Sequence, residues 1–176
     1  MIRCSLSRGF TLIEILVVLV VVGLLAALAV TNMGGASQQR ELESRVRELY
    51  LLMQTASEQA ILNNQELGLV FTDDGYQFVV FDDESGEWTD QGARLFRPRV
   101  LPEWVTITPL IESELPKLGG EGTTQRPDLV FFSSGETTPF ELEFTVGSDS
   151  DYLHRIVSDG VSPLEWQHPG EQGGES

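Results

Sequence analysis

The segment RGFTLIEILVVLVVVGLLAALAV, residues 8–30, combines a long apolar run with one acidic residue inside that run. From Phe10 to Val30, Glu14 is the only charged residue. About 20 apolar residues in a helix span the ~30 Å hydrocarbon core of a bilayer, so the run is long enough for a membrane helix. A carboxylate within lipid is costly, and it indicates a function for Glu14 if its charge has a partner.

Two ordinary interpretations of this segment leave Glu14 without a role. In a secretory signal peptide, Arg3 and Arg8 form the basic region, and the sequence ALA at 27–29 resembles a cleavage site that leaves Val30 first in the mature chain. In a plain membrane anchor, the two arginines stay in the cytoplasm and the rest of the chain faces outward.

A third interpretation gives the carboxylate a partner. Residues 8–14, RGFTLIE, resemble the class III leader of the type IV pilin and pseudopilin superfamily. The resemblance implies that a prepilin peptidase cleaves between Gly9 and Phe10 and that Phe10 is then N-methylated. It also implies that the apolar segment is retained as a membrane anchor and filament core. In a filament, Glu14 would then face the α-amino group of a neighbouring Phe10, because opposite charges attract strongly in a low-dielectric core.

The segment after the apolar run has a second helical pattern. Its apolar residues recur at steps of three or four, which predicts an amphipathic helix that packs on a domain. The pairs Glu41–Arg45 and Glu43–Arg47 have the i,i+4 spacing of favourable ion pairs, and NN at 63–64 suits a helix end. The apolar positions are Leu42, Val46, Leu49, Met53, Ala56 and Ala60.

Strand patterns replace the helical pattern from residue 67 onward. The DDG sequence at 73–75 separates two apolar runs, 67–72 and 76–81, and predicts a β-hairpin. We also expect strands at 87–89, 94–96, 104–108, 129–132, 140–146 and 154–158, and a long loop over 111–128.

A second resemblance narrows the family. The stretch FFSSGETTPFELEF, residues 131–144, resembles the strand, glycine-containing turn and strand of the type II secretion minor pseudopilin H group, a likeness shared with FimT-like minor pilins. The implied fold is α+β and pilin-like: a long N-terminal helix, half in the membrane and half amphipathic, packs on an antiparallel β-sheet domain. The implied parts are a leader (1–9), a transmembrane and filament-core helix (10–30), an amphipathic continuation (31–64), a periplasmic β domain (65–168) and a disordered tail (169–176).

Charge and motif content exclude several classes of function. The chain has 27 acidic and 11 basic residues and a net charge of −16, and Arg3 and Arg8 of these bases lie in the leader. Such a surface repels phosphate backbones, so we expect no nucleic-acid partner. The single cysteine, Cys4, forms no internal disulfide. No P-loop, dinucleotide fingerprint or zinc-type cysteine spacing is present, and we expect no cofactor and no metal.

Two weak candidates for chemistry remain. His154 or His168 with Ser158 and Asp159 has the residue types of a hydrolase triad, but no nucleophile-elbow pattern accompanies them. We therefore expect no catalysis there.

The second candidate is a pair of acidic stretches, 82–84 and 149–151, which offer oxygen ligands to calcium without EF-hand spacing. We expect them to be surface turns. We expect Trp88, Trp104 and Trp166 in core or strand-face positions.

The family resemblance implies a non-enzymatic minor pseudopilin of the type II secretion system, which helps export folded proteins across the outer membrane. It would be a single-pass protein of the bacterial inner membrane with its C-terminal domain in the periplasm. The implied partners are prepilin peptidase, major and other minor pseudopilins, the inner-membrane secretion platform and membrane lipid.

Two alternatives stay open at this point. One is a FimT-like minor type IV pilin that acts in pilus assembly, adhesion or DNA uptake. The other is a secreted or anchored periplasmic binding domain. Cleavage before Val30 instead of Phe10 would identify the secreted form of the second alternative.

Overall fold

The computed structural model describes residues 11–31, 33–111, 126–147 and 149–170. The chain forms two compact units, which divide between Gln38 and Gln39. Gly9 and Phe10 lie outside the described residues, as does position 32, so a helix that continues from 10 to 63 stays a prediction. Most of the loop predicted over 111–128 and most of the tail predicted over 169–176 lie outside them too.

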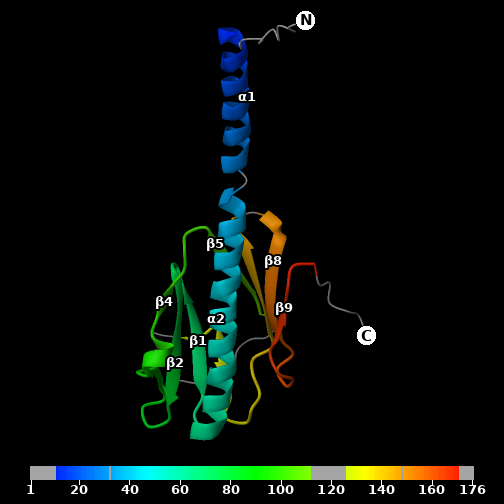
Figure 1. The fold of residues 1–176 in the computed structure, drawn as a ribbon. Helices are drawn as coiled ribbons and strands as arrows, with labels where there is room; N and C mark the ends of the chain where they lie inside the picture. The colour runs from blue at the N-terminus through cyan, green and yellow to red at the C-terminus, as the bar shows by residue number, and fades with distance from the viewer. Residues whose placement is uncertain (1–10, 32, 112–125, 148, 171–176) are drawn as a thin grey trace, which may run out of the picture. The chain divides into compact units, whose positions relative to one another are not determined.

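The helix of the first unit is α1 (Leu12–Thr31), drawn in blue in Figure 1. Its described side chains, at 12–25, are all exposed, and Glu14 is the only charged one among them. Within the described residues, no helix is both long enough and apolar enough to cross a membrane. The membrane span over 10–30 stays a prediction.

The helix α2 (Met33–Asn63) enters the second unit and carries the predicted apolar stripe. The stripe is confirmed, because each of its six residues is at most 1% exposed. The two predicted ion pairs also form, with N···O distances of 3.5 Å for Arg45–Glu41 and 3.0 Å for Arg47–Glu43. Both pairs are exposed, so each contributes only a few tenths of a kcal/mol.

The end of α2 is set by backbone conformation at Asn64. Asn64 has φ 50°, a left-handed conformation that asparagine tolerates better than most residues. The N–H of Gln65 donates to the carbonyl of Ala60 at 3.1 Å, which is the six-to-one bond of a Schellman motif. The helix therefore ends at the predicted position, and the chain turns directly into the first strand.

Two antiparallel sheets follow. The first sheet has the strand order β3-β2-β1-β6, with β4 paired to β2, and the second has the order β5-β7-β8-β9. The strands of the first sheet are β1 (Leu67–Thr72), β2 (Gly75–Asp82), β3 (Glu87–Asp90), β4 (Arg99–Val100) and β6 (Leu129–Phe131). Those of the second are β5 (Val105–Leu110), β7 (Phe140–Val146), β8 (Asp149–Ser158) and β9 (Glu165–Gln167).

The core lies between α2 and the inner faces of both sheets, and Figure 1 shows α2 running along the strands. Because side chains alternate along a strand, Leu67 and Leu69 of β1 face the helix, as do Leu142 of β7 and Ile156 of β8. A smaller apolar cluster of Val79, Trp88 and Val130 lies in the first sheet apart from this core.

The strand predictions are largely confirmed, with one error. Residues 94–96 form a 3-10 helix, η1 (Arg94–Phe96), instead of a strand. The N–H of Phe96 donates to the Ala93 carbonyl at 2.9 Å, and its ring packs on Phe78 with centroids 4.9 Å apart. The packing of the Phe96 ring on Phe78 therefore determines the secondary structure of this segment. The short strands β4 and β9 were not predicted.

Candidate functional site

The first turn of α1 presents the residue that the sequence singles out. The N–H groups of Glu14 and Ile15 donate to the carbonyl of Thr11 at 3.1 Å and 3.3 Å, so the helix begins just before Glu14. A carboxylate in the first turn is favoured by the positive end of the helix dipole. The backbone thus holds Glu14 in the N-terminal turn of α1, a few residues after the predicted cleavage position. Gly9 and Phe10 themselves lie outside the described residues.

The surface of α1 around Glu14 is apolar on every side. Leu12 is 85% exposed, Ile13 70% and Val18 52%, and these residues lie on different faces of the helix. A helix that is hydrophobic all round is stable in lipid or among other helices, and it is unfavourable in water. The apolar surface of α1 can therefore bind a bilayer or an apolar helix of a partner. Glu14 is the one residue of α1 that can attract a positively charged group.

Ser158 and Asp159, which have the residue types of a hydrolase triad, form hydrogen bonds around the turn after β8. The hydroxyl of Ser158 lies 2.7 Å from that of Thr137, and it accepts the N–H of Gly160 at 3.1 Å. The carboxylate of Asp159 accepts the N–H of Ser162 at 2.7 Å and its hydroxyl at 2.7 Å. Both side chains therefore stabilise the turn after β8, and the pKa of Asp159 is lowered mainly by the Ser162 N–H.

The two histidines lie instead with Trp166, at the contact between α2 and β9. The ring of His154 on β8 is 5.9 Å from the ring of Trp166 and 5.9 Å from that of His168, between centroids. From α2, Tyr50 packs on Trp166 at 5.9 Å, and the guanidinium of Arg47 lies 5.6 Å from the Trp166 ring centroid. This cluster fixes β9 against the helix.

Tyr50 adds a hydrogen bond to that contact, because its hydroxyl donates to the carbonyl of Leu164 at 3.0 Å. The sequence alone did not indicate the contacts of Tyr50 and Arg47 with Trp166, because both residues lie off the apolar stripe of α2. A tyrosine and an arginine one turn apart on a helix give no signal until the position of β9 is known.

His154 is the buried titratable group of this cluster. It is 5% exposed, and its Nδ1 has no hydrogen-bond partner in the described part of the chain. Burial lowers the pKa of His154, the nearby His168 lowers it further, and Glu43 acts in the opposite direction. A histidine that is kept neutral in an aromatic contact fits a structural role.

The acidic stretches do not form a metal centre among the described residues, where no group of three or more potential ligands gathers. Asp82 accepts the N–H of Glu84 at 2.9 Å, so residues 82–84 form the expected turn. The backbone N–H groups of Glu84 and Ser85 lower the pKa of Asp82. Residues 149–151 belong to strand β8, and the expected turn there is wrong. Val146 pairs with Asp149 across a β-bulge.

The tryptophans occupy the expected positions. Trp88 is 5% exposed in the smaller cluster, and Trp104 and Trp166 pack partly buried against the main core.

Known proteins resemble this chain over nearly its whole length. Residues 45–160 match the family described as Type II transport protein GspH, and residues 4–30 match the prokaryotic N-terminal methylation motif. Type II secretion system protein H of Pseudomonas aeruginosa is 35% identical over 161 residues, which cover 88% of this chain and 92% of that relative. The protein of the same name from Aeromonas hydrophila is 29% identical over 168 residues, with coverage of 90% and 92%.

A solved structure shares the fold. The minor pseudopilin EpsH from the Type 2 Secretion System of Vibrio cholerae superposes with a TM-score of 0.61 at 24% identity, covering 74% of this chain and 99% of that chain. This likeness confirms the predicted α+β, pilin-like architecture. Together with the family match over residues 45–160, the extended identity to protein H establishes that the chain belongs to the GspH family of type II secretion pseudopilins.

Proposed function

We propose that this chain is a minor pseudopilin, a non-enzymatic filament subunit that helps a type II secretion system export folded proteins. The observation that carries the proposal is the family match of the second unit, joined to a methylation motif that begins before α1. In this proposal prepilin peptidase removes residues 1–9, and Phe10 becomes the methylated N-terminus.

The proposed location is the inner membrane, crossed once by residues 10–30, with residues 65–168 in the periplasm. The apolar sequence from Phe10 to Val30 supports the anchor, because its length matches a bilayer core. The high negative charge supports a domain that stays clear of anionic lipid headgroups. Major and other minor pseudopilins, the secretion platform and membrane lipid are the proposed partners.

Glu14 has the central role in the proposed assembly step. An unpaired carboxylate in a filament core is costly, and a neighbouring Phe10 amine offsets that cost when the two charges meet. A subunit one step out of position leaves both groups unpaired. The pair would therefore set the register of the new subunit, and the apolar surface of α1 would provide most of the attraction.

The test is complementation of a strain that lacks the gene, with the Glu14→Ala and Glu14→Gln variants and with Glu14→Asp as the matched control that keeps the charge. We expect all variants to be processed at Gly9. We expect the two uncharged variants to be lost from filaments and to leave cargo in the periplasm, and Glu14→Asp to restore part of the secretion. Normal filament entry of processed Glu14→Ala would refute the charge role.

A further inference from the structure

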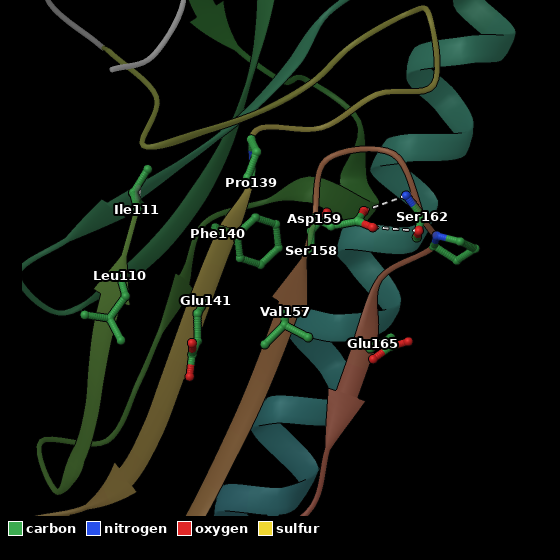
Figure 2. A pocket seen from close by; sticks show the side chains of 11 residues that line it. Leu110, Ile111, Pro139, Phe140, Glu141, Val157, Ser158, Asp159, Ser162 and Glu165 are labelled. Atoms are coloured by element: carbon green, nitrogen blue, oxygen red, sulfur yellow. Dashed lines mark hydrogen bonds between the residues drawn. The ribbon is translucent and has the colours of Figure 1, made fainter. Parts of the chain in front are cut away.

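The face of the second sheet that points away from α2 has a hollow with acidic edges. This groove has a volume of about 860 Å³. Its floor is a row of four side chains in register across the sheet, Leu110, Glu141, Val157 and Glu165, one from each strand. Figure 2 shows Glu141, Val157 and Glu165 side by side on β7, β8 and β9, with the turn after β8 closing one end.

The groove combines apolar surface with negative charge. Val157 lies between the two glutamates, Leu110 is 46% exposed beside Glu141, and Pro139 and Pro163 line the closed end. Asp159 adds a third carboxylate, and among the described residues no lysine, arginine or histidine lines the groove. The volume falls in the range of sites that bind small ligands or short peptide segments.

The three carboxylates are not equally available. Glu141 pairs with Arg155, 3.0 Å away on the next row of β8. Asp159 accepts backbone N–H groups within its turn, which leaves it ionised. Glu165 is exposed and forms no ion pair in the described part of the chain. Glu165 is therefore the strongest candidate to bind an incoming cation.

The charge of the whole chain restricts what can occupy the groove. A second copy would bring a surface of the same sign, since the chain has 27 acidic and 11 basic residues. Anionic lipid and nucleic acid are repelled for the same reason. We propose that this groove binds a short extended segment of another protein in which lysine or arginine residues flank an apolar side chain.

The geometry sets the spacing that such a segment needs. Strands lie about 4.8 Å apart, so Glu141 and Glu165 are about 10 Å apart on either side of Val157. In an extended chain, residues i, i+2 and i+4 point to one face and span about 13 Å, and lysine side chains are long enough to adjust to the shorter distance. The apolar residue between the two cations would then lie over Val157.

The inference does not depend on the filament role, because its test uses the isolated full-length chain in micelles of a neutral detergent. The probe is the dye-labelled peptide Lys-Ser-Leu-Ser-Lys, and binding is followed by fluorescence anisotropy. Two matched peptides separate the contribution of charge from that of the apolar residue. Glu-Ser-Leu-Ser-Glu reverses the charge, and Lys-Ser-Ser-Ser-Lys removes the apolar residue. We expect only the first peptide to bind well, and added salt to weaken its binding.

The variant Glu165→Lys reverses the charge of the exposed carboxylate in the groove. It should weaken binding about tenfold, because a favourable charge contact becomes a repulsive one. Glu84→Lys is the matched control, since Glu84 is exposed in the turn between β2 and β3 of the other sheet. Circular dichroism checks that both variants are folded, and Val157→Thr, which keeps the branched shape, tests the apolar floor if Glu165→Lys unfolds.

Several results would overturn the proposal. Undetectable binding at about 1 mM peptide would do so, as would equal binding of the acidic peptide. If Glu84→Lys lost as much peptide binding as Glu165→Lys, the loss would come from the net charge of the chain and not from the groove. Self-association of the chain that is lost in Glu165→Lys, without peptide binding, would assign the groove to a second copy.

Discussion

The packing of α2 is best tested by two leucines that differ almost only in burial. Leu49 is 1% exposed in the core between α2 and the sheets, whereas Leu51, two residues further along the same helix, is 54% exposed. Replacing each by alanine makes the same chemical change in the same helix. Differences in helix propensity therefore nearly cancel between the two variants.

The size of the effect follows from the buried surface. Leucine to alanine removes three carbon atoms, worth about 2.4 kcal/mol when they are fully buried, and the cavity that remains raises the cost to about 3–5 kcal/mol. For Leu51, about half of the side chain is already in water, so the expected loss of unfolding free energy is about 1 kcal/mol or less. The expected difference in Tm is about 5–15 °C for a domain of this size.

The assay is thermal unfolding of both variants in a neutral detergent, followed by circular dichroism and tryptophan fluorescence. We expect Leu49→Ala to unfold well below Leu51→Ala, and Leu51→Ala to unfold close to the unchanged protein. If the two variants unfold at the same temperature, the stripe of α2 is not the core of the β domain, and the packing described above is wrong.

Two further predictions concern β4 and the histidine cluster. In Gly75→Ala the new Cβ would overlap the carbonyl oxygen of Arg99, so β4 must shift, and urea unfolding should show a loss of about 1–3 kcal/mol of unfolding free energy. In the control Gly92→Ala the new Cβ meets no atom within 4 Å, and an equally large loss of stability there would contradict the steric explanation. The lowered pKa of His154 means that the unfolded chain binds more protons below about pH 6.5, so stability should fall as the pH drops below that value and level off below the folded pKa. In His154→Phe, unfolding measured between pH 5 and 7 should lose this slope, and an unchanged slope would show that another group titrates.

Periodic patterns made much of the second unit predictable. The six stripe residues of α2 were identified because a helix repeats every 3.6 residues, and the repeat extends over several turns. The hairpin of β1 and β2 was predicted from a turn of two aspartates and a glycine between apolar runs, and Thr72 pairs with Gly75 as that short turn requires.

Short segments were not predictable, because other parts of the chain decide their structure. The strand β9 has three residues, too few for a pattern, and it is positioned by the contact between Trp166 and Tyr50. Phe96 fits a strand by propensity, yet its packing on Phe78 favours a 3-10 turn. Local preference is a weak guide when one buried aromatic ring can outweigh it.

The candidate sites also differ in how far the sequence alone predicts them. Gly9, Phe10 and Glu14 lie within one short motif, so the sequence alone was enough to propose their roles. The floor of the groove on the second sheet comes from four different strands, and only the register places Glu141, Val157 and Glu165 in one row. No sequence motif could have indicated it.

The most direct test of the account is the mass of the mature N-terminus, measured on protein from cells that contain the cognate prepilin peptidase. The account predicts an N-terminal peptide that begins with methylated Phe10 and retains Glu14. A chain that begins at Val30 would contradict it, because the apolar segment would then be a discarded signal peptide and Glu14 would have no place in a filament.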